Sequence, residues 1–489
     1  MSRSSCRTSP TARISLATSA STNIAGAGNG PTAATTPAGT SRSGGSHEPL
    51  DRGRSPSASA HAWRWPCRLR RSAAQARPGR ARPDRGCRCQ SAVGQATLLT
   101  AAECGVRMFP GGVYLGSDFG ETTVVGQFGR WPLRRHLEVA GCRTTKAPEH
   151  AIALHVGAGR RRMQRGVQCW ADGWAGLVGI EAPADPPRGG NEIGGVLAGA
   201  MGIGEVFRSA VLGDKLACRR TSRFSALSPG CEDGGDIDLA YLPAAFWLLG
   251  LGNLGQAALW TIGLLPYSDP SLISLFLQDG DKSEFGNLAI QVLTKPDWIG
   301  RKKARSAALW AEERGFGTTI IENRFVEGTK RSADEPGLAL VGVDNLAARR
   351  AAAGSNFDLV LDAGLGATPS EIFDIRIHGF PGTRSPKQAW PEPDFQPEMP
   401  LDRTLQELVD AGRIDRCGAV TIAGRSLGVP STAVAAAAIQ VAQACRAVCD
   451  GGFFDLADVT LVNCRRATGR RHALARPGIL PFQQARSEY

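Results

Sequence analysis

Apolar and polar positions alternate most regularly in the second half of the chain, from about residue 240 onward. Short apolar runs of strand length are separated by segments in which apolar residues recur at helical spacing. The predicted strands are AFWLLGLG, LISLFLQDGD, TTIIENRF, LALVGVDN, FDLVLDAGLG and EIFDIRIHGF. The predicted helices are NLGQAALWTIGLL, KKARSAALWAEERG, LAARRAAA and the Ala-rich PSTAVAAAAIQVAQACRAVCDGG. This order predicts an α/β fold in which helices cover both faces of a mostly parallel sheet.

The first half of the chain carries weaker patterning. Residues 1–100 are rich in Arg, Ser, Gly and Pro, and we expect a disordered tail because such a segment buries too little apolar surface to offset its ordering entropy. Residues 101–235 are predicted to be a poorly defined region with one helix near 191–213. The main domain is expected over 236–465, and residues 466–489 are predicted to be a loose C-terminal tail.

The formal net charge of +12 belongs entirely to the N-terminal tail. Residues 1–100 hold fifteen Arg, no Lys and three acidic residues, whereas the remaining 389 residues hold 42 basic and 42 acidic side chains. A basic tail can bind polyanions without specificity, but the balanced remainder gives no reason to expect a specific nucleic-acid partner. Two alternatives stay open: that Arg without Lys is an artefact of translating GC-rich DNA, or that the start site is over-extended.

Targeting signals and cysteine chemistry narrow the class of protein further. The sequence has no run of 18 apolar residues and no apolar stretch near its start, so we expect neither a membrane span nor secretion, and a cytoplasmic location is the default. The 13 cysteines contain no pair of C-x-x-C motifs. Neither a disulfide framework nor a structural zinc site is therefore expected.

A glycine-rich turn follows the first predicted strand of the main domain. Gly250, Gly252 and Gly255 form a G-x-G-x-x-G pattern at the start of a predicted helix. Such a turn can hold a dinucleotide, hold ATP, or simply allow close packing of a strand on a helix. An NAD-binding unit expects an acidic residue about 20 residues beyond the turn, whereas Asp279 and Asp281 come later.

Those acids open a longer series of motifs. The series continues through LQDGDKSEFGNLAIQVL, the G-x-x-K of GRKK and the D-N-x-x-x-R of VGVDNLAARR. In this order, over roughly 240–455, the motifs resemble the ThiF/MoeB/HesA family, which includes the adenylation half of ubiquitin-activating enzymes. Members are ATP-dependent adenylyltransferases with a Rossmann-like fold, so the resemblance implies ATP and Mg²⁺ as ligands.

The resemblance assigns roles to residues around the nucleotide. Asp279 matches the acid that holds the ATP ribose, and Asp281, Asn287 and Gln291 match the polar residues that surround the ATP. Lys303 matches the lysine that reaches the phosphates, where a fixed ammonium stabilises negative charge.

A second group of assignments concerns the metal. Asp344 matches the magnesium-associated aspartate, and a hard carboxylate suits that ion. Two structural alternatives stay open: Asp344 and Asn345 could cap the next helix, and Lys303 could lie on a solvated helix face.

The chain departs from the family pattern at one position. The family usually has Arg directly before the Gln, where it stabilises the transferring phosphate, and this chain has Ile290. Arg301, Lys302 or Arg349 could compensate. Arg223 is the candidate for the second family arginine, which comes from a segment before the glycine turn and often crosses a dimer interface.

Cys417 precedes a Gly-rich loop and the last long helix, as the family cysteine does. The resemblance implies that this thiol receives the activated acyl group as a thioester or carries sulfur, for which it must be exposed and partly ionised. A buried, inert cysteine is the alternative.

The function implied by the resemblance is ATP-dependent activation of the C-terminal carboxylate of a ubiquitin-like or sulfur-carrier protein. Relatives are commonly dimers, so a homodimer fits. Two alternatives stay open: a catalytically inactive ThiF-like scaffold, favoured by Ile290, and an NAD-dependent oxidoreductase.

Overall fold

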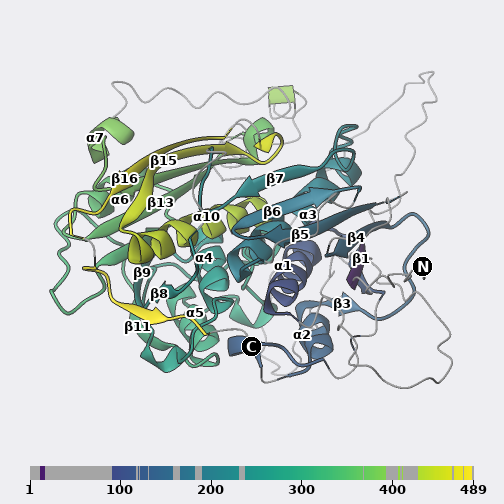
Figure 1. Ribbon diagram of the computed structural model, residues 1–489, viewed down its shortest axis with the longest axis horizontal. Coiled ribbons are helices and arrows are strands. Elements are labelled where there is room, and N and C mark those ends of the chain that lie inside the picture. Colours follow the sequence, from purple (N-terminus) through teal and green to yellow (C-terminus); the bar gives the residue numbers. More distant parts are fainter. Residues whose placement is uncertain are drawn as a thin grey trace, which may run out of the picture.

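Two large sheets organise the part of the chain that the computed structural model describes (Figure 1). One has seven strands and belongs to the N-terminal lobe, and the other has eight strands and belongs to the C-terminal lobe. The described residues are 12–16, 91–391, 406–407, 410 and 428–486, with gaps at 117–118, 120–121, 130, 158–162, 164–165, 182–189, 231–236, 367, 465–466 and 477.

The N-terminal lobe has the strand order β3-β2-β1-β4-β5-β6-β7. Its strands are β1 (Ala12–Leu16), β2 (Val113–Leu115), β3 (Cys142–Arg143), β4 (Ile152–Val156), β5 (Gly166–Asp172), β6 (Ala175–Gly179) and β7 (Ser222–Ser225). Its helices are α1 (Ala92–Met108), α2 (Leu133–Ala140) and α3 (Glu192–Ala210).

Helices α1 and α3 pack closely because small residues line their contact. A Cβ added to Gly195 would lie 2.6 Å from the carbonyl oxygen of Val93, and one added to Gly199 would overlap that of Thr97. Helix α3 begins at a side-chain cap, in which the Gly194 N–H donates to Asn191 Oδ1 at 2.9 Å. The helix predicted near 191–213 is therefore confirmed.

The prediction that residues 1–100 form a disordered tail is wrong at two segments that the structure describes. Strand β1 lies between β2 and β4 in the N-terminal sheet, and α1 begins at Ala92. The apolar side chains of Leu98 and Leu99 are buried in the core, which explains why the segment from Ala92 is helical. The other residues of the predicted tail lie outside the described residues.

The C-terminal lobe has the strand order β11-β10-β9-β12-β13-β14-β15-β16. Its first five strands in chain order are β9 (Ala245–Leu249), β10 (Ser274–Gln278), β11 (Gly317–Ile321), β12 (Leu338–Val341) and β13 (Leu359–Leu365), all mutually parallel. The antiparallel extension consists of β14 (Asp374–Phe380), β15 (Gly452–Thr460) and β16 (Thr468–Ala473). The parallel part has the doubly wound order of a Rossmann-like sheet, as predicted.

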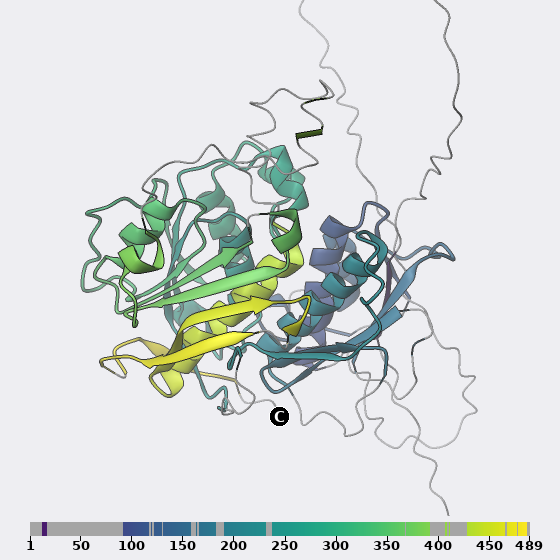
Figure 2. The ribbon, with the colours of Figure 1, turned by 90° about the horizontal axis from the view of Figure 1, so that it is seen from above.

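Helices cover both faces of this sheet, which confirms the predicted fold class. On one face lie α4 (Asn253–Gly263), α5 (Lys303–Glu312) and α10 (Pro430–Cys449), and on the other α6 (Leu346–Ala353) and α7 (Pro386–Ala389). Helix α10 runs between the two lobes, where it contacts both α3 and α4 (Figure 2). One apolar core therefore continues from the N-terminal lobe into the C-terminal lobe.

Helix α10 is long and apolar enough to cross a membrane, but 89% of its most apolar window is buried inside the protein, as in a core helix.

The chain after α10 is not loose throughout, contrary to the prediction for 466–489. Strand β16 extends the sheet, and β17 (Phe482–Gln484) pairs with β8 (Tyr241–Pro243). β16 pairs with the preceding strand β15, whereas β17 pairs with the distant β8.

Two glycines of the turn after β9 should respond differently to alanine. A Cβ on Gly255 would overlap the carbonyl oxygen of Gly250, whereas one on Gly252 would meet no atom within 4 Å. We expect Gly255→Ala to lower the free energy of unfolding by about 2–4 kcal/mol and Gly252→Ala by less than about 1 kcal/mol, measured by urea unfolding. Equal losses in the two variants would contradict the packing of α4 on the turn.

Candidate functional site

The glycine turn lies where the strand order of the C-terminal sheet reverses. Strands β10 and β12 flank β9, so the loops after these three parallel strands meet at one edge. The Gly250 N–H donates to the Gln278 carbonyl at 2.9 Å, and the Gly342 N–H donates to the Leu249 carbonyl at 2.9 Å. The edge outside the carboxyl ends at such a reversal is where open α/β sheets bind ligands.

The three glycines of the predicted motif, Gly250, Gly252 and Gly255, have different structural roles in this turn. Gly250 has a positive φ of 82°, which favours glycine. Gly255 lets α4 touch the Gly250 carbonyl, and Gly252, the residue before α4, faces open space. The amino end of α4 is therefore open to a ligand at Gly252, as an anion-binding turn requires.

Asp279 joins the loop after β10 to the glycine turn. Its Oδ2 accepts the Leu251 N–H at 2.7 Å and its Oδ1 accepts the Asp281 N–H at 2.7 Å. The side chain is buried, and each carboxylate oxygen keeps a further lone pair. Its predicted contact with a ribose stays a prediction, and the structure adds that Asp279 holds the turn in place.

Asp281 and Lys303 lie together at the same edge. The Lys303 ammonium is 3.4 Å from Asp281 Oδ2, and the Lys303 N–H donates to the Asp281 carbonyl at 3.0 Å. Arg324 contacts the other carboxylate oxygen at 3.2 Å. Partial burial acts to raise the pKa of Asp281, but Lys303 and Arg324 hold it below its usual range. Lys303 begins α5 and is directed back toward the loop after β10.

Asn287 and Gln291 have structural contacts that the sequence did not predict. Asn287 Oδ1 accepts the Glu284 N–H at 2.9 Å and so caps the 3-10 helix η4 (Phe285–Ala289). Gln291 is buried, and its Oε1 accepts from Gln256 Nε2 at 2.8 Å and from Thr294 Oγ1 at 2.9 Å. Gln291 thereby holds the segment after η4 against α4.

Asp344 lies in the loop after β12, beside the glycine turn. The neighbouring Val343 side chain is so close to Gly250 that a Cβ on Gly250 would be 2.8 Å from it. Asp344 is exposed, whereas Asn345 caps α6 by accepting the Ala348 N–H at 2.7 Å. The capping alternative therefore holds for Asn345, and the carboxylate of Asp344 stays accessible.

Asn253 is a site residue that the sequence reasoning missed. It is the first residue of α4, and both polar atoms of its side-chain amide are buried without a hydrogen-bond partner in the described structure. Gly428, just before α10, approaches so closely that a Cβ there would overlap Asn253 Nδ2. An unsatisfied buried amide is costly, which indicates a site built for a polar ligand. Its position inside the glycine motif was the available signal.

Comparisons with known proteins find matches in both lobes. Residues 87–226 match the family model of the BilD N-terminal domain, and residues 242–451 match that of the BilD C-terminal domain. The chain is 38% identical over 268 residues to the bacterial E1-like protein BilD of Collimonas sp. (strain OK412). The chain is similar to E1-like BilD in both lobes. The aligned part covers 53% of this chain and 57% of that BilD, so it spans little more than half of the relative.

Two solved structures align with parts of the chain at 16% sequence identity. E. coli tRNA N6-threonylcarbamoyladenosine dehydratase, TcdA, aligns over 22% of this chain and 45% of its own, with a TM-score of 0.19. SeMet PaaA aligns over 47% of this chain and 64% of its own, with a TM-score of 0.29. At these TM-scores neither adds to the fold that the strand order shows.

The arginines near Ile290 differ from those that the sequence suggested. Arg223 lies on β7 and is 3.8 Å from Asp172 in the N-terminal lobe, with no described contact to the turn. Arg107 of α1 reaches the segment instead, donating from Nε to the Gln291 carbonyl at 2.8 Å and from NH2 to the Thr294 carbonyl at 3.2 Å. No pattern in the sequence indicates this contact, because it joins the two lobes.

The structure also shows where the three cations lie that could compensate for Ile290. Lys302 donates to the Gly280 carbonyl, and Arg301 is exposed. Arg349 donates to Asp362 Oδ2 at 3.1 Å and to the Val343 carbonyl at 2.9 Å. Arg349 therefore supports the loop that carries Asp344.

Cys417 lies outside the described residues, so its predicted role stays a prediction. Among the described cysteines, burial raises the pKa of Cys218 and Cys464 to about 12, and it raises the pKa of Cys445 well above its usual value. These thiols stay protonated at neutral pH and are poor nucleophiles.

A buried acid and histidine lie behind the Asp344 loop. His378 Nδ1 is 4.0 Å from Asp362 Oδ2, and both side chains are almost inaccessible. Burial raises the pKa of Asp362 to about 6, against the opposing effect of Arg349. Burial, followed by the field of Arg376, lowers the pKa of His378 to about 4. Burial therefore shifts the equilibrium of each group toward its neutral form.

Asp362→Asn should change how stability depends on pH. The folded pKa of Asp362 is raised to about 6 from an ordinary 3.8, so its stabilisation is present below pH 3.8 and is lost as the pH rises to about 6. His378, with its pKa lowered from 6.5 to about 4, stabilises above pH 6.5 and loses that contribution as the pH falls. The two effects oppose each other in the wild type.

The variant keeps only the histidine contribution. Its free energy of unfolding should therefore rise with pH between about 4 and 6, relative to the wild type, by on the order of 2–3 kcal/mol. Thermal melts across this range measure the difference. A parallel curve for Asp362→Asn would contradict the assignment.

Proposed function

We propose that this chain is an ATP-dependent adenylyltransferase that activates the C-terminal carboxylate of a ubiquitin-like or sulfur-carrier protein. One observation carries the proposal: the loops bearing Asp279, Lys303 and Asp344 meet the glycine turn at one edge of the sheet. The similarity to BilD, named a bacterial E1-like protein, supports the same class of activity.

The residues at this edge fit ATP and Mg²⁺. The open face at Gly252 and the unsatisfied amide of Asn253 suit phosphate oxygens and polar groups of a nucleotide. Within the described residues no group of three or more His, Cys, Asp or Glu side chains forms a metal cluster. Mg²⁺ needs only one or two carboxylates when phosphates supply its other ligands, so Asp344 alone could hold it.

The chemistry follows from the charges at this edge. An oxygen of the partner's C-terminal carboxylate attacks the α-phosphorus of ATP, the bond from that phosphorus to the bridging oxygen breaks, and pyrophosphate leaves. Lys303 would stabilise the negative charge on the phosphates, and Mg²⁺ at Asp344 would neutralise more of it. Asp279 and Asn253 would orient the nucleotide. The product is an acyl-adenylate, a better acyl donor than the carboxylate.

Cys417 would complete the reaction. Its thiolate would attack the acyl carbon of the adenylate, forming a thioester and releasing AMP. The described cysteines with raised pKa values are unsuited to that step, and the place of Cys417 before the Gly-rich loop, as in the family pattern, supports its role.

A second candidate function is that of a catalytically inactive scaffold that binds nucleotide or a partner protein. Ile290 favours it, because an apolar side chain stands where relatives place a phosphate-stabilising arginine. Lys302 and Arg349 are bound to neighbouring backbone or acid groups, so neither is a ready replacement. Absence of ATP–pyrophosphate exchange in the wild type with every carrier protein tried would favour the scaffold.

Lys303→Ala and Asp344→Ala should each lower ATP–pyrophosphate exchange by at least about 100-fold. The first removes the ammonium that would stabilise the phosphates, and the second removes the carboxylate that would hold Mg²⁺. Lys330→Ala and Asp334→Ala, which change exposed residues of the loop before β12, are the matched controls and should keep wild-type rates. All four variants should melt like the wild type. Wild-type exchange in both site variants would refute the assignment.

Cys417→Ser should leave ATP–pyrophosphate exchange unchanged while abolishing a thiol-labile adduct with the carrier protein. Exchange reports only the first step, whereas the adduct, followed by non-reducing gel electrophoresis, requires the thiolate. Cys449→Ser is the control, since that thiol is partly buried and has a raised pKa. Loss of exchange in Cys417→Ser would show that the residue supports the fold or the nucleotide site instead.

A further inference from the structure

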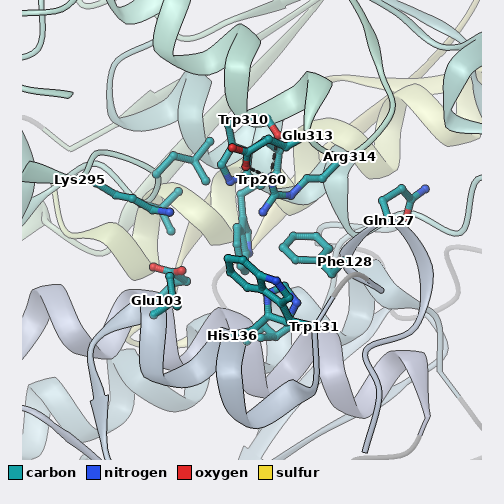
Figure 3. Close-up of a pocket in the computed structure, with 14 residues that line it drawn as sticks. Glu103, Gln127, Phe128, Trp131, His136, Trp260, Lys295, Trp310, Glu313 and Arg314 are labelled. Atoms are coloured by element: carbon teal, nitrogen blue, oxygen red, sulfur yellow. Dashed lines mark hydrogen bonds and ion pairs between the residues drawn. The ribbon is translucent and has the colours of Figure 1, made fainter. Parts of the chain in front are cut away.

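A pocket separate from the candidate site lies between the two lobes (Figure 3). Its volume is about 210 Å³. Phe128, Trp131 and His136 line it from the N-terminal lobe, and Trp260 of α4 and Trp310 of α5 line it from the C-terminal lobe. Trp260 is seven residues after the start of α4, about 10 Å along the helix, so this pocket is distinct from the candidate nucleotide site.

The rings of the aromatic wall pack against one another. Phe128 meets Trp260 and Trp310 edge-on, at centroid distances of 5.5 and 5.9 Å. The Arg314 guanidinium lies 3.8 Å from the Trp310 ring and 4.5 Å from the Phe128 ring. Trp260 Nε1 also donates to Thr100 Oγ1 at 3.0 Å. A pocket formed in advance loses little entropy on binding.

The mouth of this pocket leaves apolar surface uncovered. Trp131 is 43% exposed and Val139 is 41% exposed, although both line the pocket. Trp131 lies against His136 at a ring distance of 5.5 Å. A ligand entering here would cover a tryptophan that the described fold leaves open to solvent.

Each of the two acidic groups that line the pocket lies within ion-pair distance of an arginine. Glu103 pairs with Arg107 at 2.6 Å, and Glu313 lies 3.6 Å from Arg314. Lys295 also lines the pocket, and no ion pair joins it to a described residue. An anionic group is the complement of this arrangement.

His136 adds a hydrogen-bonding atom. Its Nε2 is buried and has no hydrogen-bond partner within the described structure. Burial lowers the pKa of His136, and Arg314 and Lys295 lower it further, so the imidazole is neutral at pH 7. Both cations line the same pocket as His136.

We propose that this pocket binds a small aryl carboxylate, a single aromatic ring with a carboxylate a few bonds away. A cavity of about 150 Å³ accommodates benzene, so one of 210 Å³ has room for a ring and a short acidic arm. The ring packs against Trp131, Trp260 and Phe128, and the carboxylate pairs with Lys295.

This binding site goes beyond the proposed adenylation and does not depend on it. Lys295 directly follows Thr294, whose hydroxyl contacts Gln256 of α4 and Gln291. The pocket therefore shares a wall with the segment that holds the candidate nucleotide site, but its ligand can be tested without ATP or a carrier protein.

Isothermal titration of the full chain with 3-phenylpropionate tests the proposal. We expect saturable binding of one molecule per chain, about tenfold weaker binding of the neutral 3-phenylpropanamide, and similar weakening for hexanoate, which lacks the ring. Lys295→Met should weaken 3-phenylpropionate about tenfold, while Lys295→Arg should retain binding. Lys330→Met, at an exposed lysine outside the pocket, is the matched control and should bind like the wild type.

Three results would overturn the proposal: no saturable binding of 3-phenylpropionate at millimolar concentration, equal affinity for the acid and its amide, or equal affinity in Lys295→Met and Lys330→Met. The comparison of the acid with its amide uses the wild-type chain alone. It decides the role of the charge even if Lys295→Met fails to fold.

Discussion

The contact between α4 and the carbonyl of Gly250 is the constraint on which the candidate site depends. Gly255 permits this contact, since any larger residue would overlap that oxygen. The helix therefore starts directly on the turn, and its amino end lies at the reversal of the strand order. Asp279 then fixes the Leu251 N–H. Lys303 and Asp344 lie at the same edge of the sheet as this turn.

The C-terminal lobe could be predicted in detail because its elements carry local signals. Strands such as β9 and β12 are continuous apolar runs, and the helices after them are amphipathic or Ala-rich. The N-terminal sheet lacked such signals. Strand β3 has two residues, and β1 pairs with β2 and β4 across more than 90 residues of chain. Pairing over such distances leaves no periodic trace in either segment.

The candidate site was predictable to the extent that parallel strands end together. Asp279 follows β10 and Asp344 follows β12, the two strands that flank β9. The order of the motifs alone therefore placed both residues at one edge of the sheet. Contacts between lobes were not predictable, which is why Arg107 was missed and Arg223 was named. Gln291 shows a related limit, since a polar residue in a motif can be buried in a hydrogen-bond network.

Hydrogen–deuterium exchange with and without Mg·ATP tests the central claim, that this edge holds ATP rather than a nicotinamide nucleotide. The account predicts slower exchange on addition of Mg·ATP at the amides of the glycine turn, of the loop after β10 and of the loop before α6. NADH at the same concentration should leave those amides unchanged. Protection of the turn by NADH but not by Mg·ATP would contradict the account.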